Sequence, residues 1–187
     1  MTTTTVRNGI DVQQLLDTID ATKTDEAVGT FTFRAESTWK DGTYNVGSIG
    51  RFSHAGEEDD TREQPFTLDG DEPPVLLGSN RGPNAVELVL QALGFCYAVG
   101  YVANAAAQGI DLTRMDYEVE GDLDVRSFLG QDGPRPGFTD IRVRGRVSSP
   151  NATDDQLAEL CRYVQETSPV RDIIANQVPV TTALEVV

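Results

Sequence analysis

Two cysteines are the residues of this sequence with the clearest capacity for nucleophilic or redox chemistry. Cys96 falls in the middle of the most apolar segment, and Cys161 falls on the apolar stripe of a second helical segment. A thiolate is a strong nucleophile, whereas a buried free cysteine otherwise acts as a small hydrophobe. Position alone therefore leaves Cys96 open to both interpretations, and it favours a packing role for Cys161.

Other residue types that carry chemistry are sparse. The single histidine, His54, has no second histidine or CxxC motif near it, so neither a metal site nor a cofactor is expected. Arg34 lies on the polar face of a predicted strand, and its simplest interpretation is a solvated arginine. Glu87 is the only charged residue of the apolar segment, where a carboxylate near a helix N-terminus is favourable.

The segment 84–108 is predicted to form a central helix that carries Cys96. Pro83 suits the start of a helix and Gly109 its end. Apolar side chains occupy nearly every face, which is typical of a helix that is buried or spans a membrane. Glu87, Asn104 and the acidic strands that follow favour a buried core helix.

Alternating residues predict strands on both sides of this helix. In the N-terminal half, 30–38 and 43–53 form a hairpin that turns at Asp41-Gly42. The stretch 54–70 is mostly loop, with a short strand near Phe66 and Leu68.

The C-terminal half carries a second pair of alternating segments. Residues 115–125 place acidic side chains outward, and residues 138–147 place arginines outward. Opposite charges on neighbouring strands favour antiparallel pairing through cross-strand ion pairs. A last strand is expected at 178–187.

Two amphipathic helices complete the prediction. One covers 11–22; the other begins at a Thr153/Gln156 capping box and ends before Pro169. Without repeats or a linker, we expect one α/β (α+β) domain over 1–187. Its N-terminal tail and short helix cover 1–28, and its core covers 29–187.

The charge balance limits the classes of molecule that the protein is expected to bind. The 187 residues include 30 acidic and 15 basic side chains, and the net charge of -15 argues against nucleic acid and anionic membranes. Lysine occurs only twice, and an acidic, lysine-poor surface is also typical of a salt-adapted protein. We see no signal peptide, and two cysteines do not make a disulfide scaffold, so a cytoplasmic location is expected.

Several motifs together resemble the OsmC/Ohr family of osmotically inducible and organic-hydroperoxide-resistance proteins. They are Asp71-Glu72-Pro73-Pro74-Val75-Leu76-Leu77-Gly78, the run from Gly82 to Cys96, Gly109-Ile110-Asp111-Leu112, Gly137-Phe138, Thr167-Ser168-Pro169-Val170 and Asn176-Gln177-Val178-Pro179-Val180. The resemblance covers about two-thirds of the chain in family order.

This resemblance implies an intertwined homodimer, with curved antiparallel sheets around long central helices and sites at the dimer interface. It also implies reduction of organic hydroperoxides by a peroxidatic cysteine, which corresponds to Cys96. An arginine and a glutamate activate that thiolate in the family, and Arg34 and Glu87 are the candidates here. Attack on a peroxide would leave a sulfenic acid that a second thiol recycles.

The sequence departs from the family pattern in two places. Ser168 precedes Pro169-Val170, where the family has its resolving cysteine, and serine cannot form a disulfide. Val86 stands where the family has its glutamate, and the carboxylate follows one position later at Glu87. One residue turns a helical side chain by about 100°.

The sequence is therefore compatible with two main functions. The first is a peroxidase that uses Cys96 with an external thiol reductant in place of a resolving cysteine. The second is a non-catalytic homodimer that binds a small lipophilic ligand in a stress response. A structural protein without a site is a third possibility.

Overall fold

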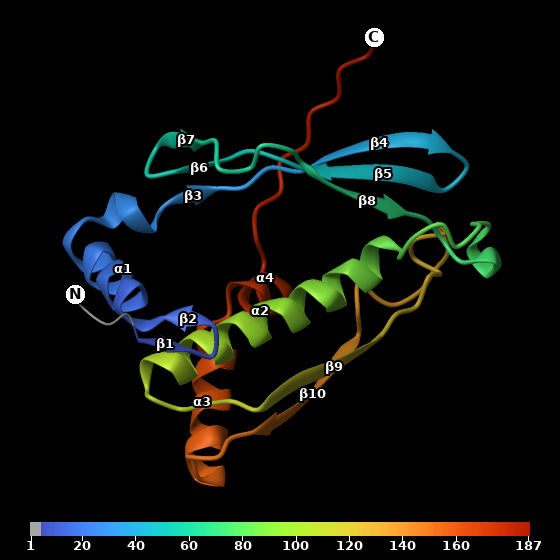
Figure 1. Cartoon of the computed structure of the whole chain (residues 1–187). Coiled ribbons are helices and arrows are strands. Elements are labelled where there is room, and N and C mark those ends of the chain that lie inside the picture. Colours follow the sequence, from blue (N-terminus) through green and yellow to red (C-terminus); the bar gives the residue numbers. More distant parts are fainter. Residues whose placement is uncertain (1–4) are drawn as a thin grey trace. The chain divides into compact units, whose positions relative to one another are not determined.

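Helix α2 (Ala85–Ala107) confirms the central helix expected from the sequence (Figure 1). The structure, a computed structural model, describes residues 5–187, so the first four residues of the predicted N-terminal tail lie outside it. The contacts divide the chain into two units, Met1–Val89 and Leu90–Val187. One domain over 1–187 stays a prediction.

The first unit contains an N-terminal helix and small antiparallel sheets with the strand orders β1-β2, β3-β6-β7 and β4-β5-β8. In chain order, its elements are β1 (Val6–Arg7), β2 (Ile10–Asp11), α1 (Val12–Thr24), the 3-10 helix η1 (Glu26–Gly29), β3 (Phe31–Thr32), β4 (Glu36–Asp41), β5 (Tyr44–Ile49), β6 (Phe52–His54), β7 (Glu57–Asp59), β8 (Phe66–Gly70) and the 3-10 helix η2 (Pro74–Leu76). Helix α1, the β4–β5 hairpin at Asp41-Gly42 and the strand at Phe66 confirm the predictions.

Three strand predictions in this unit are wrong in detail. The segments 30–38 and 43–53 are each divided between the two three-stranded sheets, with residues 33–35 and 50–51 outside the ladders. The alternation of polar and apolar residues continues where the chain passes from one sheet to the other, because it depends on which face a side chain occupies and not on which strand the backbone pairs with. Strand β7 was expected to be loop, since its acidic residues have low strand propensity, yet it pairs with β6 through backbone groups.

The second unit pairs two strands and packs helices on them. Strands β9 (Arg114–Asp122) and β10 (Asp140–Ser148) form an antiparallel ladder, as predicted. Arg142 contacts Asp122 at 2.5 Å and Arg146 contacts Glu118 at 2.6 Å across it. These arginines hold the pKa of both carboxyls below the usual range, chiefly through side-chain hydrogen bonds. These ion pairs are exposed, so they contribute little to stability. Their main effect is to favour the pairing of β9 with β10.

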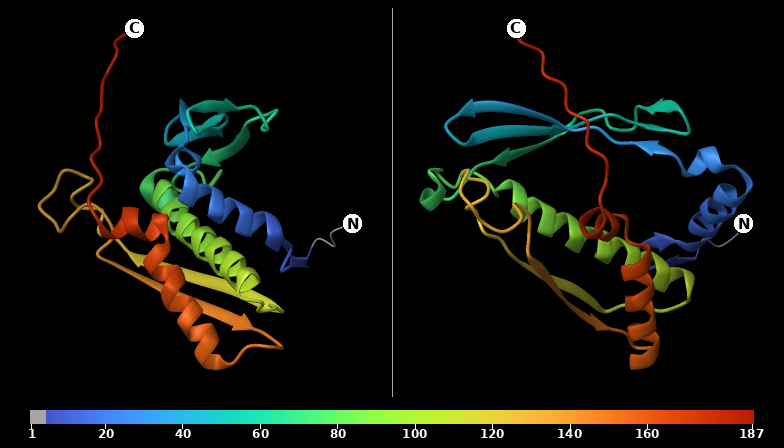
Figure 2. Two further views of the ribbon diagram at one scale, coloured as in Figure 1. Left: turned by 90° about the vertical axis from the view of Figure 1, so that its left-hand side faces the viewer. Right: turned by 180° about the vertical axis from the view of Figure 1, so that it is seen from behind.

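Helices α2 and α3 (Asp154–Thr167) pack against one face of the β9–β10 hairpin (Figure 2). The Thr153/Gln156 capping box that begins α3 is confirmed. The buried hydrophobic side chains of the described residues all lie in this unit: Leu93, Tyr97, Tyr101, Ala105, Ala106, Ile110, Leu160 and Val164. Along α2 the buried residues recur at helical spacing, so only one side of that helix faces this core.

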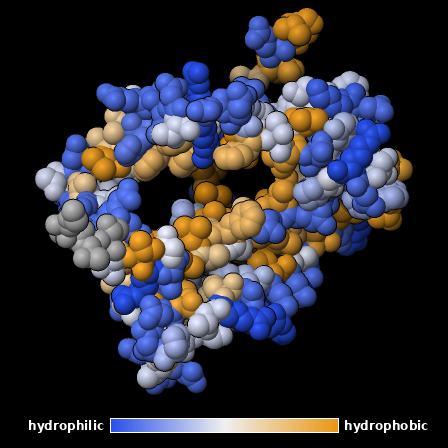
Figure 3. Space-filling model, in the orientation of Figure 1, coloured by the Kyte–Doolittle hydropathy of each residue, from blue (hydrophilic) through white to orange (hydrophobic). Residues whose placement is uncertain are grey.

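The prediction that α2 is buried on nearly every side is wrong in the isolated chain. Phe95 is 64% exposed and Val99 is 70% exposed, and hydrophobic side chains lie at the surface along α2 (Figure 3). By length and composition, α2 is apolar enough to span a membrane, a criterion that core helices of soluble proteins also meet. The second unit supplies packing partners for one side of α2 only.

The C-terminal end also differs from the prediction. Residues 178–187, expected to form a strand, form no ladder with the described residues. A strand needs a hydrogen-bonded neighbour, and its composition alone does not supply one. Pro169 does more than end α3: it occupies the first turn of a further helix, α4 (Pro169–Ala175), where its missing N–H costs nothing.

Candidate functional site

Cys96 and Ser168 form the central contact of the candidate site. The Cys96 Sγ atom lies 3.2 Å from the Ser168 Oγ atom, although 72 positions separate the residues in sequence. Cys96 is half-buried on α2, and Ser168 is buried. The structure thus brings the candidate nucleophile directly to the position where the sequence lacks a second thiol.

Ser168 is held in place by the start of α4. It is the N-cap of that helix, and its Oγ atom accepts a hydrogen bond from the Arg171 N–H at 3.1 Å. A serine hydroxyl donates one proton and accepts through two lone pairs. The cap uses a lone pair, which leaves the Ser168 proton available for the Cys96 sulfur.

Cys161 occupies a different part of the second unit. Its Sγ atom accepts a hydrogen bond from the Gln165 side-chain amide at 3.4 Å, within α3. The thiol is half-buried and borders two cavities of about 230 and 270 Å³. Cys161 packs against the hydrophobic core of the second unit, as its place on the apolar stripe predicts, and its thiol also adjoins polar groups and open space.

Arg34 lies in the first unit, between β3 and β4. Its guanidinium donates two hydrogen bonds to the Glu58 carboxylate, at 3.0 and 2.8 Å. It also lines a cavity of about 410 Å³ in which Arg51 and Arg62 are neighbours. Arg34 thus already has a carboxylate partner, in a partly exposed setting.

Glu87, also in the first unit, forms a capping box with Asn84. Its carboxylate accepts a hydrogen bond from the Asn84 backbone N–H at 2.8 Å, and its own N–H donates to the Asn84 side chain at 2.9 Å. This reciprocal arrangement satisfies two backbone donors at the start of α2. The sequence predicted a favourable carboxylate at this terminus, and the contacts give it a specific structural task.

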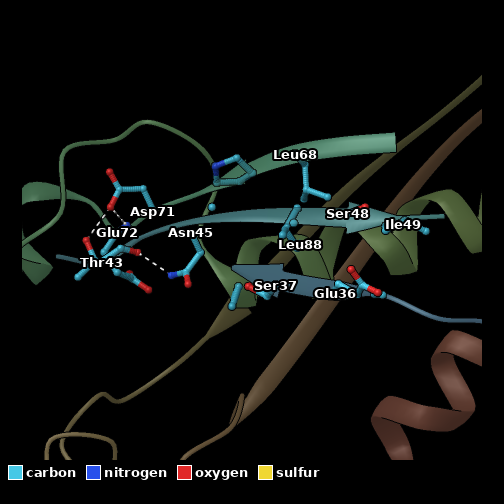
Figure 4. Close-up of a pocket in the computed structure, with 15 residues that line it drawn as sticks. Glu36, Ser37, Thr43, Asn45, Ser48, Ile49, Leu68, Asp71, Glu72 and Leu88 are labelled. Carbon is cyan, nitrogen blue, oxygen red and sulfur yellow. Dashed lines mark hydrogen bonds between the residues drawn. The ribbon is translucent and has the colours of Figure 1, made fainter. Parts of the chain in front are cut away.

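A cavity of about 430 Å³ lies within the first unit, lined by β4, β5, β8 and the residues that lead into α2 (Figure 4). Its walls include the apolar side chains of Ile49, Leu68 and Leu88. Asp71 lies at one end, buried, where its carboxylate accepts the Thr43 hydroxyl proton at 2.6 Å. Asp71 begins the first of the motifs quoted from the sequence, but sequence reasoning assigned it no role, because an aspartate before prolines is typical of any turn.

The Asp71 carboxylate organises the loop that precedes α2. Besides Thr43, it accepts backbone N–H groups from Glu72, Ser79 and Arg81 at 2.9 to 3.2 Å. The Thr43 hydrogen bond and then the backbone donors lower the pKa of Asp71 to about 2. The buried Asp71 carboxylate therefore links the beginning of this loop, at Glu72, to its end, at Ser79 and Arg81.

Acidification is expected to remove this contribution to stability. The folded pKa of Asp71 lies below that of the unfolded chain, so the contribution is complete above about pH 4 and is lost as the pH falls toward 2. Asp71→Asn should lower the melting temperature at neutral pH and flatten its decline between those pH values. Calorimetry measures how the melting temperature of this variant changes with pH, and Asp132→Asn, which changes a carboxyl in an exposed loop, is the control. If both variants lost melting temperature equally between pH 4 and pH 2, the role given to Asp71 would be wrong.

The sequence model of the OsmC-like proteins matches residues 78–183, more than half of the chain. The chain belongs to the OsmC-like protein family. Comparison with curated protein sequences gave no match. The family therefore covers the end of the loop before α2, the Cys96 helix and the whole second unit except its last residues.

Solved structures show the same OsmC-like fold. The OsmC-like protein of Mycoplasma pneumoniae superposes with a TM-score of 0.58 at 15% identity, over 77% of this chain and 87% of that one. An OsmC-like protein from Vibrio cholerae gives 0.52 at 13% identity, over 75% and 91%. The organic hydroperoxide resistance protein OsmC of Legionella pneumophila gives 0.51 at 18% identity, over 76% and 88%.

Two glycines in the OsmC-like motifs have a steric explanation in this chain. A Cβ atom on Gly78 would lie 1.8 Å from the Glu72 carbonyl oxygen, and one on Gly82 would lie 2.2 Å from the Asp69 carbonyl oxygen. Backbone atoms cannot move aside as the end of a side chain can, so only glycine fits at either position. These motif residues shape the loop before α2 and do not themselves carry chemistry.

Proposed function

We propose that this OsmC-like protein reduces organic hydroperoxides through Cys96, with an external thiol in place of a resolving cysteine. The observation that carries the proposal is the 3.2 Å contact between the Cys96 Sγ and Ser168 Oγ atoms. When Cys96 is a thiolate it cannot donate, so the hydrogen bond must run from the serine hydroxyl to sulfur. A donor at this distance favours the nucleophilic form of the cysteine.

The reaction proceeds in two stages. The Cys96 thiolate attacks one peroxide oxygen, the O–O bond breaks, an alcohol leaves with a proton, and sulfur is oxidised to a sulfenic acid. One external thiol then displaces water and forms a mixed disulfide with Cys96. A second external thiol attacks that disulfide, so the reductant leaves as its own disulfide and the thiol is restored.

Arg34 and Glu87 remain in the proposal as the activating pair that the family resemblance implies. Glu58 and the start of α2 are their present partners. If these side chains activate the thiolate, Arg34→Gln and Glu87→Gln lower the rate of sulfenic acid formation. Melting curves of both variants distinguish that effect from a loss of structure. Glu87→Gln should retain the structure, because glutamine also completes a capping box.

The decisive measurement is turnover of an organic hydroperoxide by the purified protein. Consumption of cumene hydroperoxide should require added dithiothreitol, and peptide mass spectra should place the oxidised sulfur at Cys96. The competing function, a non-catalytic dimer for a lipophilic ligand, is favoured by the partly apolar cavity of about 430 Å³ in the first unit. A Cys96 thiol that survives the hydroperoxide unmodified in folded protein would support that function instead.

The proposal includes a homodimer, which two features support. No hydrophobic side chain among residues 5–89 is buried in the chain, although burial of apolar surface is the main favourable term in folding. The exposed apolar side of α2 carries Phe95 and Val99. A second copy that covers such surfaces would form a hydrophobic, obligate interface. We also retain a cytoplasmic location without nucleic-acid or membrane partners.

Sedimentation velocity at micromolar concentration is expected to give the mass of two chains. Val99→Glu should shift the protein toward one chain, because it places a charge on the exposed apolar side of α2. Gln108→Glu adds the same charge beyond the end of α2 and should leave the dimer intact. A folded wild-type monomer under these conditions would rule out the obligate dimer.

A further inference from the structure

A second cavity, of about 230 Å³, lies within the second unit between α2, the β9–β10 hairpin and α3. Its polar wall comes from Tyr97, Tyr117, Gln165 and Arg171, with the Cys161 thiol beside them. The proposed peroxidase reaction uses none of these side chains. At about 30 Å³ per water, the cavity has the volume of roughly eight water molecules.

Tyr97 is the most informative residue of this wall. Its side chain is only 6% exposed, yet its hydroxyl has no hydrogen-bond partner among the described residues, whereas the Tyr101 hydroxyl donates to the Leu157 carbonyl at 2.8 Å. In the described part of the chain, every side-chain oxygen or nitrogen that is fully shielded from solvent has a hydrogen-bond partner. The Tyr97 oxygen therefore keeps contact with solvent, and because Tyr97 lines the cavity, its hydroxyl is free to donate to a group bound there.

The remaining polar groups give the cavity the character of an anion site. The Tyr117 hydroxyl also has no partner among the described residues, and its ring lies 5.7 Å from that of Tyr97. The exposed Arg171 guanidinium donates a hydrogen bond to the Gln165 backbone carbonyl at 3.5 Å and has no carboxylate within 4 Å in the described chain; no acidic residue lines the cavity. Burial raises the pKa of Tyr97, and the Arg171 guanidinium opposes that rise, as expected of a nearby cation.

The rest of the cavity is apolar. Ile141 and Val143 contribute from β10, and Val164 contributes from α3. A ligand that fits must therefore combine one anionic end with a compact apolar body. A phosphate or sulfate would leave these side chains without contacts. A neutral hydrocarbon would leave the two phenols without hydrogen bonds and the Arg171 charge without a counter-ion.

We propose that this cavity binds a small monocarboxylate, with its carboxylate at the Arg171 guanidinium and the Tyr97 hydroxyl and its apolar body against Ile141, Val143 and Val164. The site adjoins the Cys96–Ser168 contact, since the Arg171 N–H donates to the Ser168 Oγ atom, but its occupation does not require Cys96 to be redox-active. The failure of one proposal therefore leaves the other intact.

Isothermal titration with benzoate tests this site on the reduced full-length protein. We expect saturable binding of one benzoate per chain. Tyr97→Phe and Arg171→Gln should each weaken binding about tenfold, the effect of losing one charge-assisted hydrogen bond. Tyr163→Phe and Arg162→Gln make the same chemical changes on the outer part of α3 and should bind as the wild type does. Tyr97→Phe removes an oxygen with no protein partner, so the fold should persist.

Benzyl alcohol provides the matched neutral probe, with the same ring and a hydroxymethyl group in place of the carboxylate. Binding at least about tenfold weaker than that of benzoate supports the anion site. Equal binding of the two probes would show an apolar cavity and overturn the proposal. So would the absence of saturable benzoate binding at millimolar concentration, or benzoate affinity unchanged in both Tyr97→Phe and Arg171→Gln.

Discussion

Cys96→Ser is expected to lower hydroperoxide turnover at least about a thousandfold, as loss of a catalytic nucleophile does in other enzymes. The hydroxyl of serine is far less ionised than a thiol at neutral pH and cannot become a sulfenic acid. The fold should be retained, because the new oxygen replaces sulfur beside the Ser168 hydroxyl and can form a hydrogen bond there. Coupled assays with dithiothreitol and an organic hydroperoxide measure the loss.

Cys161→Ser is the matched control for this experiment. It makes the same atomic change on α3, where the thiol accepts only the Gln165 amide. Turnover should remain within about twofold of the wild type, since Cys161 takes no part in the proposed reaction. If Cys161→Ser were the inactive variant and Cys96→Ser the active one, the assignment of the nucleophile would be wrong.

Ser168→Cys is expected to change the fate of the oxidised protein. In the wild type, the sulfenic acid at Cys96 has no neighbouring thiol, so excess hydroperoxide should drive it to sulfinic and sulfonic acids unless an external thiol intercepts it. In the variant, the introduced thiol should attack the Cys96 sulfur and release water. The Sγ–Oγ distance of 3.2 Å must shorten to the roughly 2.05 Å of a disulfide, which side-chain rotation can accommodate.

Intact-mass spectra before and after reduction distinguish the two outcomes. Ser168→Cys should lose two hydrogens and resist over-oxidation, whereas the wild type should gain oxygen. Ser148→Cys, with its new thiol at the exposed end of β10, should over-oxidise at Cys96 as the wild type does. A Ser168→Cys protein that still gains oxygen at Cys96 would show that the two positions do not meet in solution.

The sequence predicted well whatever depends on local pattern. Asp154–Thr167 was expected as a helix because Thr153 and Gln156 form a capping box, and β9 and β10 were paired because their outward charges are opposite. Strand exchange between sheets was missed, since residues 33–35 interrupt a ladder without interrupting the alternation. The strand at 178–187 failed because pairing depends on a neighbour that composition does not specify.

The site was predictable to a similar degree. Family motifs point to Cys96 and single out Ser168, but the 3.2 Å contact needs the packing of α4 beside α2 in the second unit. Glu87 was recognised as a helix-terminal carboxylate, yet its reciprocal bond with Asn84 is a matter of side-chain geometry. Nothing in the sequence indicated a binding role for Tyr97, because a sequence does not show whether a tyrosine hydroxyl has a hydrogen-bond partner.

The uneven distribution of buried residues has a consequence for biosynthesis. Residues 5–89 are translated before residues 90–187, yet they contain no buried hydrophobic side chain, whereas the core around Tyr101 and Leu160 belongs to the later segment. The hydrophobic core of the described chain can therefore form only after residues 90–187 have been translated. Aromatic residues such as Phe31 (47% exposed) and Phe33 (67% exposed) stay accessible to chaperones and proteases even in the folded chain, so in the proposed dimer it is the association of two chains, and not folding of one, that protects them.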